Sequence, residues 1–296
     1  MALGSRTLLN LGLVAAIVVL ALLAIYEPGK EKPAEEPRIL QLNSDGISNL
    51  RIERVNGPTI VLERQKSTWR MTEPLQIRVS DYRISSLLRI TEIKSLTHFT
   101  AAAESLKQYG LDSPDATLII NGNIRIEFGN STPIDQRRYL RIGNTIHLIT
   151  DNYFYYLIGA PTTFASNALL DRSGSLARLD LPGLVVAQQD NKWSATPQPA
   201  SFSADQITQL IDHWRHAQAL EVAPYDGRKG DMIRLTLTGR DEPLVFLVTE
   251  RTPELILARP DLKVQYHLPA SSVADLLTLQ PLPAQQESAP AKQPAP

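Results

Sequence analysis

The most continuous hydrophobic pattern of the chain lies near its start. Residues 8–25 read LLNLGLVAAIVVLALLAI, with Asn10 as the one polar member. A helix over this run spans roughly 27 Å at about 1.5 Å per residue, close to the hydrocarbon thickness of a bilayer. A cleavable signal peptide is the alternative, but its apolar core has only about 7–15 residues. The nearest cleavage candidate, residues 22–24, also has Leu where a small residue is expected. The pattern therefore predicts an uncleaved transmembrane anchor over residues 8–26.

The charges that flank this run predict its orientation. Arg6 and the amino terminus precede it, whereas Lys30 and Lys32 follow it among several glutamates. The positive-inside bias then favours a cytoplasmic segment at residues 1–7 and a periplasmic or extracytoplasmic location for the rest. We expect a single-pass protein of the inner (cytoplasmic) membrane that contacts the lipid bilayer through residues 8–26.

Two later segments repeat one pattern of hydrophobic and polar positions. Residues 67–74 read STWRMTEP and residues 191–197 read NKWSATP, with Trp69 and Trp193 separated by 193 − 69 = 124 positions. Pro74 and Pro197 are separated by 197 − 74 = 123 positions. Each proline is followed by a serine that can cap a helix and then by apolar residues at i, i+3, i+4 spacing, which is typical of an amphipathic helix. These positions are Ser80, Ile84, Leu87 and Leu88 in the first copy and Ser203, Ile207, Leu210, Ile211 and Trp214 in the second. In the second copy, Gln206 completes a capping box.

Alternating strands and short helices follow in both copies. Residues 49–54 and 59–63 form a predicted hairpin, and residues 117–120 and 124–128 form another around Asn121-Gly122, because Asn-Gly suits a tight turn with positive φ. A short helix is expected at the end of each copy, capped by Asp151 or by Ser271. We place each tryptophan in a turn that folds back on its core, where its N–H finds a partner.

These patterns predict an α+β protein. An N-terminal transmembrane helix is followed by two tandem repeats of a mainly antiparallel sheet-plus-helix unit, at residues 38–172 and 173–280. A charged, proline-containing spacer at residues 27–37 and a disordered proline-rich tail at residues 281–296 flank the repeats.

Composition narrows the possible functions. The formal net charge of the 296-residue chain is −1, which argues against a nucleic-acid partner, since phosphate backbones require a concentrated basic surface. The chain has no cysteine, so disulfides, thiolate metal sites and cysteine nucleophiles are excluded.

Candidate chemistry in the sequence is sparse. His213 and His216 have i, i+3 spacing on a predicted helix, but no third metal ligand is evident, and we expect solvated side chains. His147 and His267 occupy equivalent strand positions, which duplication alone explains. Asp112 and Asp115 bracket a proline and are interpreted as turn formers rather than as an acid–base pair. Phosphate-loop, nucleophile-elbow and HExxH motifs are absent from the sequence. We expect no catalytic residue, no bound metal and no cofactor.

An aromatic run at residues 153–156 is the best candidate for a contact surface. Helical spacing directs Tyr153 and Tyr156 inward and leaves Phe154 and Tyr155 outward. Phe154 and Tyr155 are therefore the predicted partner-binding residues.

Residues 109–114 read YGLDSP and residues 128–133 read FGNSTP. Together with the anchor, the spacer and the Trp-to-Pro turn, these motifs resemble those of the DUF4340 proteins of bacterial envelopes. The second copy departs from the pattern, since Tyr225-Asp226-Gly227 replaces YGLD there. The motif residues with a structural role are then Trp69, Pro74, Tyr109, Gly110, Leu111, Asp112, Pro114, Phe128, Gly129, Thr132, Pro133, Trp193 and Pro197.

The resemblance implies a functional setting. Members occur beside components of ABC-type transport systems related to gliding-motility exporters, so we expect a non-catalytic accessory or scaffold protein with a membrane protein as its partner. The alternative is an envelope module that binds a polymer or a small ligand between the two repeats. A hydrolase is a third hypothesis, for which the sequence offers no motif.

Overall fold

The computed structural model describes most of the chain. The described residues are 4–26, 38–100, 102–133, 135–170, 174–190, 192–197 and 203–279. The predicted spacer at residues 27–37, the predicted tail at residues 281–296 and residues 1–3 lie outside these ranges. The chain divides into two compact units, Met1–Pro37 and Arg38–Pro296.

The N-terminal unit contains one long helix, α1 (Ser5–Tyr26). Large apolar side chains are exposed along it, with exposed fractions from 71% at Leu9 to 49% at Leu23. Among the residues that the structure describes, no helix meets both the length and the hydropathy expected of a membrane-crossing segment. The predicted helix is present, and its insertion into a bilayer stays a prediction.

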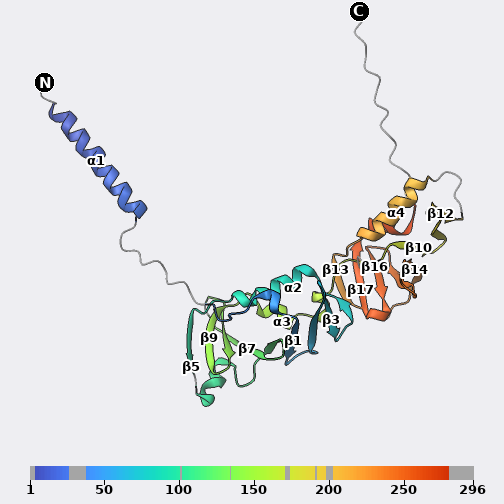
Figure 1. Ribbon diagram of the computed structural model, residues 1–296, viewed down its shortest axis with the longest axis horizontal. Coiled ribbons are helices and arrows are strands. Elements are labelled where there is room, and N and C mark those ends of the chain that lie inside the picture. The colour runs from blue at the N-terminus through green and yellow to red at the C-terminus, as the bar shows by residue number, and fades with distance from the viewer. Residues whose placement is uncertain are drawn as a thin grey trace, which may run out of the picture. The chain divides into compact units, whose positions relative to one another are not determined.

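The second unit contains two antiparallel sheets (Figure 1). The strands of the first sheet are β1 (Asn49–Arg54), β2 (Ile60–Gln65), β3 (Thr68–Glu73), β4 (Ile77–Arg78), β5 (Thr97–Thr100), β6 (Ala116–Ile120), β7 (Ile124–Ser131), β8 (Arg137–Ile142) and β9 (Thr145–Thr150). The strands of the second are β10 (Leu176–Leu181), β11 (Leu184–Gln189), β12 (Lys192–Thr196), β13 (Glu221–Pro224), β14 (Asp231–Leu237), β15 (Leu244–Glu250), β16 (Glu254–Arg259) and β17 (Val264–Pro269).

The two sheets share one strand order. The first runs β4-β3-β2-β1-β6-β7-β8-β9-β5 and the second runs β12-β11-β10-β14-β15-β16-β17-β13. Apart from the two-residue strand β4, each strand of one sheet has a counterpart at the same place in the other. The mixed α+β class is confirmed, and this shared order is the repeat-like architecture that the sequence offsets indicate.

Short helices accompany each sheet. Helices α2 (Asp81–Leu88) and α3 (Phe154–Ile158) pack against the first sheet. Helices α4 (Ala204–His216) and α5 (Ser272–Leu277) pack against the second sheet. The 3-10 helices are η1 (Ser44–Gly46), η2 (Arg89–Glu92), η3 (Ala103–Tyr109), η4 (Pro161–Phe164) and η5 (Pro260–Leu262). The apolar positions predicted for α4 are buried, because the i, i+3, i+4 stripe faces the sheet.

Both predicted hairpins form. Strands β1 and β2 pair with Ile52 opposite Ile60, and β6 and β7 pair with Ile120 opposite Ile124. In the second turn, Asn121 has φ 49° and Gly122 has φ 74°. The Asn121 side-chain oxygen also accepts a hydrogen bond from the Ser48 amide at 2.9 Å, so this turn holds the entry to β1 as well.

The edge strands β5 and β13 are features that the sequence patterns do not predict. After α2 the chain crosses to the far edge, where Phe99 of β5 lies opposite Ile146 of β9, and then returns to the middle of the sheet as β6. The second sheet repeats this path, with Val222 of β13 opposite Tyr266 of β17. None of the β5 side chains is fully buried, so the strand carries no apolar alternation.

Several local predictions need correction. Trp69 and Trp193 lie on β3 and β12 rather than in the turns, since their strands extend past the tight turns that precede them. Ser80 and Ser271 stand at helix N-caps, but neither side chain makes a capping hydrogen bond. The capping box predicted for Ser203 and Gln206 is present at the start of α4, where the Gln206 side chain accepts from the Ser203 amide at 2.8 Å.

A connector at residues 161–170 joins the two sheets. Its Ser166 amide donates to the Arg78 carbonyl at 2.9 Å, which binds it to the first sheet. Its Asn167 carbonyl accepts from the Ala219 amide at 2.8 Å, and the Asn167 side chain donates back to the Ala219 carbonyl at 2.8 Å. The connector is therefore bonded on both sides, and the buried apolar residues of both sheets form one contiguous core.

Candidate functional site

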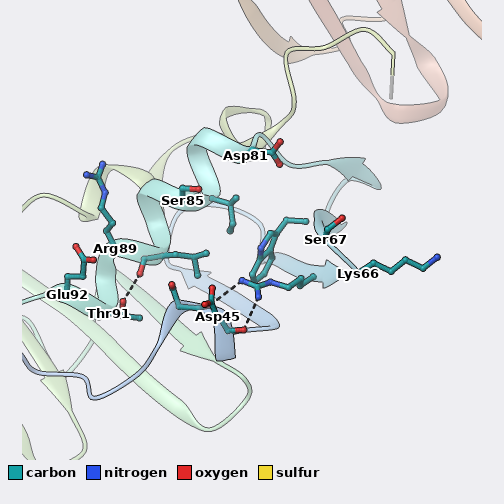
Figure 2. A pocket seen from close by; sticks show the side chains of 13 residues that line it. Asp45, Lys66, Ser67, Asp81, Ser85, Arg89, Thr91 and Glu92 are labelled. Atoms are coloured by element: carbon teal, nitrogen blue, oxygen red, sulfur yellow. Dashed lines mark hydrogen bonds between the residues drawn. The ribbon is translucent and has the colours of Figure 1, made fainter. Parts of the chain in front are cut away.

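A cavity of about 430 Å³ lies between α2 and the β2–β3 hairpin (Figure 2). Its lining combines charged and hydroxyl side chains around a tryptophan. The lining residues are Ser44, Asp45, Arg64, Lys66, Ser67, Trp69, Asp81, Ile84, Ser85, Leu88, Arg89, Thr91 and Glu92.

Trp69 and Arg64 are stacked in this cavity. The Arg64 guanidinium lies 5.1 Å from the centre of the Trp69 ring, and Trp69 is only 5% exposed. Arg64 also donates to the carbonyl oxygens of Asp45 at 2.9 Å and Ser44 at 3.2 Å, drawn as dashed lines in Figure 2. These contacts fix the guanidinium over the ring, a cation–π arrangement. The predicted structural role of Trp69 therefore has a partner that the sequence did not indicate.

The chemistry of this cavity suits binding. Its lining contains no histidine, and within the described ranges no three His, Cys, Asp or Glu side chains could hold a metal ion. Lys66 and Arg89 point away from each other in Figure 2, so the cavity has no convergent cationic cluster. The arrangement offers hydrogen-bond groups of both kinds to a polar ligand.

The residues of the YGLDSP and FGNSTP motifs meet in space. The Tyr109 carbonyl oxygen lies so close to Gly129 that a Cβ there would overlap it, and the same Cβ would lie 2.9 Å from Leu111 Cγ. Gly110 has φ 67°, in the left-handed region, and a Cβ on it would lie 2.9 Å from the Asn130 amide nitrogen. The two motifs are therefore one packing unit that requires glycine at both close approaches.

The remaining motif residues lie around this unit. Phe128 and Leu111 are buried, whereas Asp112 and Pro133 are exposed and Pro114 is half-buried. The Thr132 amide donates to the Arg137 carbonyl at 2.7 Å. In the second copy, Trp193 is half-buried, and the Thr196–Pro197 peptide bond is cis, as is Glu73–Pro74 in the first.

Arg138 is a buried cation that the sequence analysis missed. It is 7% exposed and pairs with Asp151 at 2.7 Å, and it also donates to the Gly129 carbonyl. Asp151 in turn accepts from the Phe154 amide at 3.3 Å, but the N-cap residue of α3 is Tyr153 rather than the predicted Asp151. Arg138 and the buried Leu140 lie two residues apart on β8, so their side chains point to the same face of the sheet. This spacing is the sequence signal that could have indicated a buried Arg138.

The predicted outward orientation of Phe154 is wrong. Phe154 is half-buried and packs against the core, with the Arg138 guanidinium 3.5 Å from its ring centre. The reason is that the Phe154 ring packs between Arg138 of β8 and Phe128 of β7, whose ring centre lies 6.3 Å away. Tyr155 is 54% exposed, and its ring centre lies 3.9 Å from that of Tyr156. Of the two proposed contact residues, Tyr155 is the one available at the surface.

The histidines have separate local environments. His213 Nδ1 lies 3.2 Å from the Asp275 carbonyl and His216 Nδ1 lies 2.9 Å from the Asp212 carbonyl. His147 Nδ1 lies 3.0 Å from Ser95 Oγ. Burial lowers the pKa of His147, and the neighbouring His98 lowers it further.

His267 occupies the position in β17 that matches His147 in β9. Its Nδ1 lies 2.8 Å from the Glu254 carboxylate, an acidic contact that His147 does not share. The two equivalent histidines are therefore not a symmetric pair.

A second cavity, of about 460 Å³, lies beside the connector. We call it the connector cleft. The start of α2, the connector and the end of α4 supply its lining, which comprises Arg78, Ser80, Asp81, Tyr82, Arg83, Ser166, Asn167, Ala168, Leu170, Arg215, His216, Ala217 and Gln218. It is slightly larger than the first cavity, and three arginines in its lining face one carboxylate, Asp81, whereas the first cavity has three carboxylates.

Comparison with known proteins gives one match. Residues 69–237 match the family described as Domain of unknown function (DUF4340), which is more than half of the 296-residue chain. No curated protein and no solved structure matches the chain. The matched range begins at Trp69 on β3, includes both glycine motifs and Arg138, and ends with β14 of the second sheet. The chain belongs to the DUF4340 family.

Proposed function

We propose that the protein is a non-catalytic, membrane-anchored accessory or scaffold protein that works outside the cytoplasm beside an ABC-type envelope transporter. The anchor comprises residues 8–26, and the two-sheet unit is the part that meets a membrane protein partner. The transporter as partner is proposed because the sequence motifs resemble those of the DUF4340 proteins. The membrane anchor is proposed from the apolar residues 8–26 of this chain.

The exposed apolar surface of α1 is the observation that carries this proposal. Its side chains from Leu9 to Leu23 include ten large apolar residues that are about half exposed or more, and no charged residue lies among them. Fully burying one such side chain stabilises by about 1.5–3 kcal/mol. A surface of this kind marks an interaction site with lipid or with protein. A bilayer covers every side of the helix at once, which favours lipid.

The two-sheet unit has an exposed aromatic surface on its first sheet. Tyr82 of α2 is 70% exposed, and Tyr155 and Ile158 of α3 are 54% and 51% exposed. The Tyr153 hydroxyl donates to the Arg89 carbonyl at 3.0 Å, which ties α3 to the end of α2. Tyrosine is enriched among the residues that dominate binding energy at protein interfaces. Confinement by the anchor raises the effective concentration of this surface near a membrane partner.

Crosslinking in native membranes tests the accessory role. The tagged protein is crosslinked mildly and purified, and the co-purified proteins are identified by mass spectrometry. We expect a permease and its ATPase in fixed ratio, with recovery reduced by Tyr155→Ser and unchanged by Leu220→Ser, a control at a side chain that is 72% exposed outside this surface. Recovery of the bait alone with several crosslinkers would exclude the transporter role.

The connector cleft favours a second candidate function, an envelope module that binds a ligand between the repeats. Its volume of about 460 Å³ is within the range of small-molecule sites. A ligand that binds only the folded protein raises its melting temperature. A thermal-shift screen of envelope polymers and metabolites therefore tests this function, and a hit must be lost when a cleft residue is changed.

A further inference from the structure

The connector cleft has an excess of positive charge. Its lining holds Arg78, Arg83 and Arg215 together with His216, against one carboxylate, Asp81. The chain as a whole has a net charge of −1, so this local excess is not a general property of the protein. An excess of one charge in a concave, partly desolvated site concentrates ligands of the opposite charge.

A smaller cavity continues this charge pattern. It measures about 60 Å³, shares Arg78, Ser166 and Ala168 with the connector cleft, and adds Arg70, Arg240 and Arg259. No carboxylate contributes to its lining, all of which is described. Arginines from both sheets therefore converge on the connector.

The neighbouring carboxylates neutralise this charge only in part. Asp81 pairs with Arg78 at 3.1 Å, and Asp212 pairs with Arg215 at 3.3 Å. Arg83 forms no ion pair with any described residue. The Arg78 Nε atom is buried and has no hydrogen-bond partner within the described part of the chain.

Arginine selects the chemistry of the acceptor. Its planar guanidinium presents parallel N–H groups that match the oxygens of phosphate and carboxylate. A cavity of the size of the connector cleft accommodates a tetrahedral anion together with an attached group. Three arginines in one lining favour the group with more acceptor oxygens and more charge, which is phosphate.

We propose that the connector cleft binds the phosphate group of a ligand through Arg83 and Arg215, with Arg78 adding positive charge to the same lining. The phosphate belongs either to a soluble molecule or to a lipid headgroup, which share this chemistry. This inference rests on the second candidate function and gives it a ligand class, and it does not depend on the transporter.

Isothermal titration of the detergent-purified full-length protein tests the inference. The probes are inorganic phosphate at constant ionic strength and phosphatidylglycerol in mixed micelles, with phosphatidylcholine micelles as the neutral reference. The variants are Arg83→Gln and Arg215→Gln. The matched control is Arg251→Gln, because Arg251 also pairs with a single aspartate, Asp231 at 2.7 Å, and is 45% exposed, close to the 42% of Arg215.

We expect saturable binding of at least one probe, with the dissociation constant raised about tenfold or more in each cleft variant and unchanged in the control. Binding of inorganic phosphate identifies a soluble ligand, and binding of phosphatidylglycerol alone identifies a headgroup. Far-ultraviolet circular dichroism and melting temperature establish that each variant is folded.

Two results would overturn the inference. One is the absence of saturable binding by both probes, and the other is equal weakening by Arg251→Gln, which would indicate diffuse electrostatic attraction. A neutral oligosaccharide that shifts the melting temperature through Arg83, while neither phosphate probe binds, would overturn the phosphate assignment and leave the binding-module function standing. If no ligand of either kind binds, both fail.

Discussion

The carbonyl oxygen of Tyr109 packs against the α-carbon of Gly129, leaving no room for a side chain. This contact joins the segment that enters β6 to the strand β7 that pairs with it. Both family motifs of the first sheet therefore serve one purpose, which is to let two backbone segments approach more closely than any residue with a Cβ permits.

Gly129→Ala should destabilise the protein by about 1–3 kcal/mol, because the added methyl group on β7 meets the Tyr109 carbonyl and forces the two backbone segments apart. Urea unfolding followed by circular dichroism measures the change. The control is Gly46→Ala, where a Cβ meets nothing within 4 Å and the expected change is within about 0.5 kcal/mol. Equal effects at the two glycines would contradict the packing explanation.

Arg138→Met should cost about 3 kcal/mol of stability. The substitution leaves the Asp151 carboxylate, whose side chain is 15% exposed, without its cation, and it leaves the Gly129 carbonyl without its donor. The neighbouring Arg137 is 42% exposed and serves as the control, since Arg137→Met should change stability by less than about 0.5 kcal/mol. A neutral result for Arg138→Met would mean that the buried network contributes no net stability.

Trp214→Phe should destabilise the second sheet. The Trp214 indole N–H donates to the Leu276 carbonyl at 2.8 Å, and this buried bond ties α4 to α5. Phenylalanine leaves that carbonyl unpaired, at a cost of about 1–3 kcal/mol. Trp193→Phe, at a half-buried position on β12, should have a smaller effect. Urea unfolding of the two variants gives the loss of unfolding free energy for each. A larger loss for Trp193→Phe than for Trp214→Phe would contradict the contribution of the Trp214 hydrogen bond.

Stability should fall as the pH drops below about 6.5, in part because of His147. Burial and the nearby His98 lower the pKa of His147 in the folded protein, so the unfolded chain, with an ordinary pKa of about 6.5, takes up a proton first. His147 therefore lowers the free energy of unfolding as the pH falls from about 6.5 to the lower pKa of the folded state. Above pH 6.5 His147 is neutral in both states and makes no pH-dependent contribution.

Melting temperatures from pH 7.5 to pH 5 should therefore decline less in His147→Gln than in the parent protein. The control variant is His216→Gln, at an exposed position on α4. An unchanged decline in His147→Gln would show that other groups set the acid response.

The sequence predicted those parts of the fold that have local signals. The Asn121-Gly122 turn and the apolar stripe that ends in Trp214 are each specified by adjacent residues, so the hairpin and helix α4 are found where expected. Similarity between the two copies was also visible, because the spacing of the tryptophans and prolines survives.

Other features depend on contacts between distant residues, which local patterns do not encode. The edge strand β5 pairs with β9 through its backbone and buries none of its side chains fully. Phe154 turns inward because Arg138, on a different strand, stacks on it. Arg83 and Arg215 line one cleft because the backbone bonds of residues 166–169 hold α2 and α4 on either side of the connector.

Membrane attachment underlies the proposed accessory role, and flotation of membranes on a density gradient measures it directly. The full-length protein should float with the membrane fraction and resist alkaline carbonate extraction, whereas a chain that starts at Arg38 should remain soluble and folded, since residues 38–296 form their own compact unit. Recovery of the full-length protein in the soluble or carbonate-extracted fraction would contradict the anchor, and with it the proposed role beside a transporter.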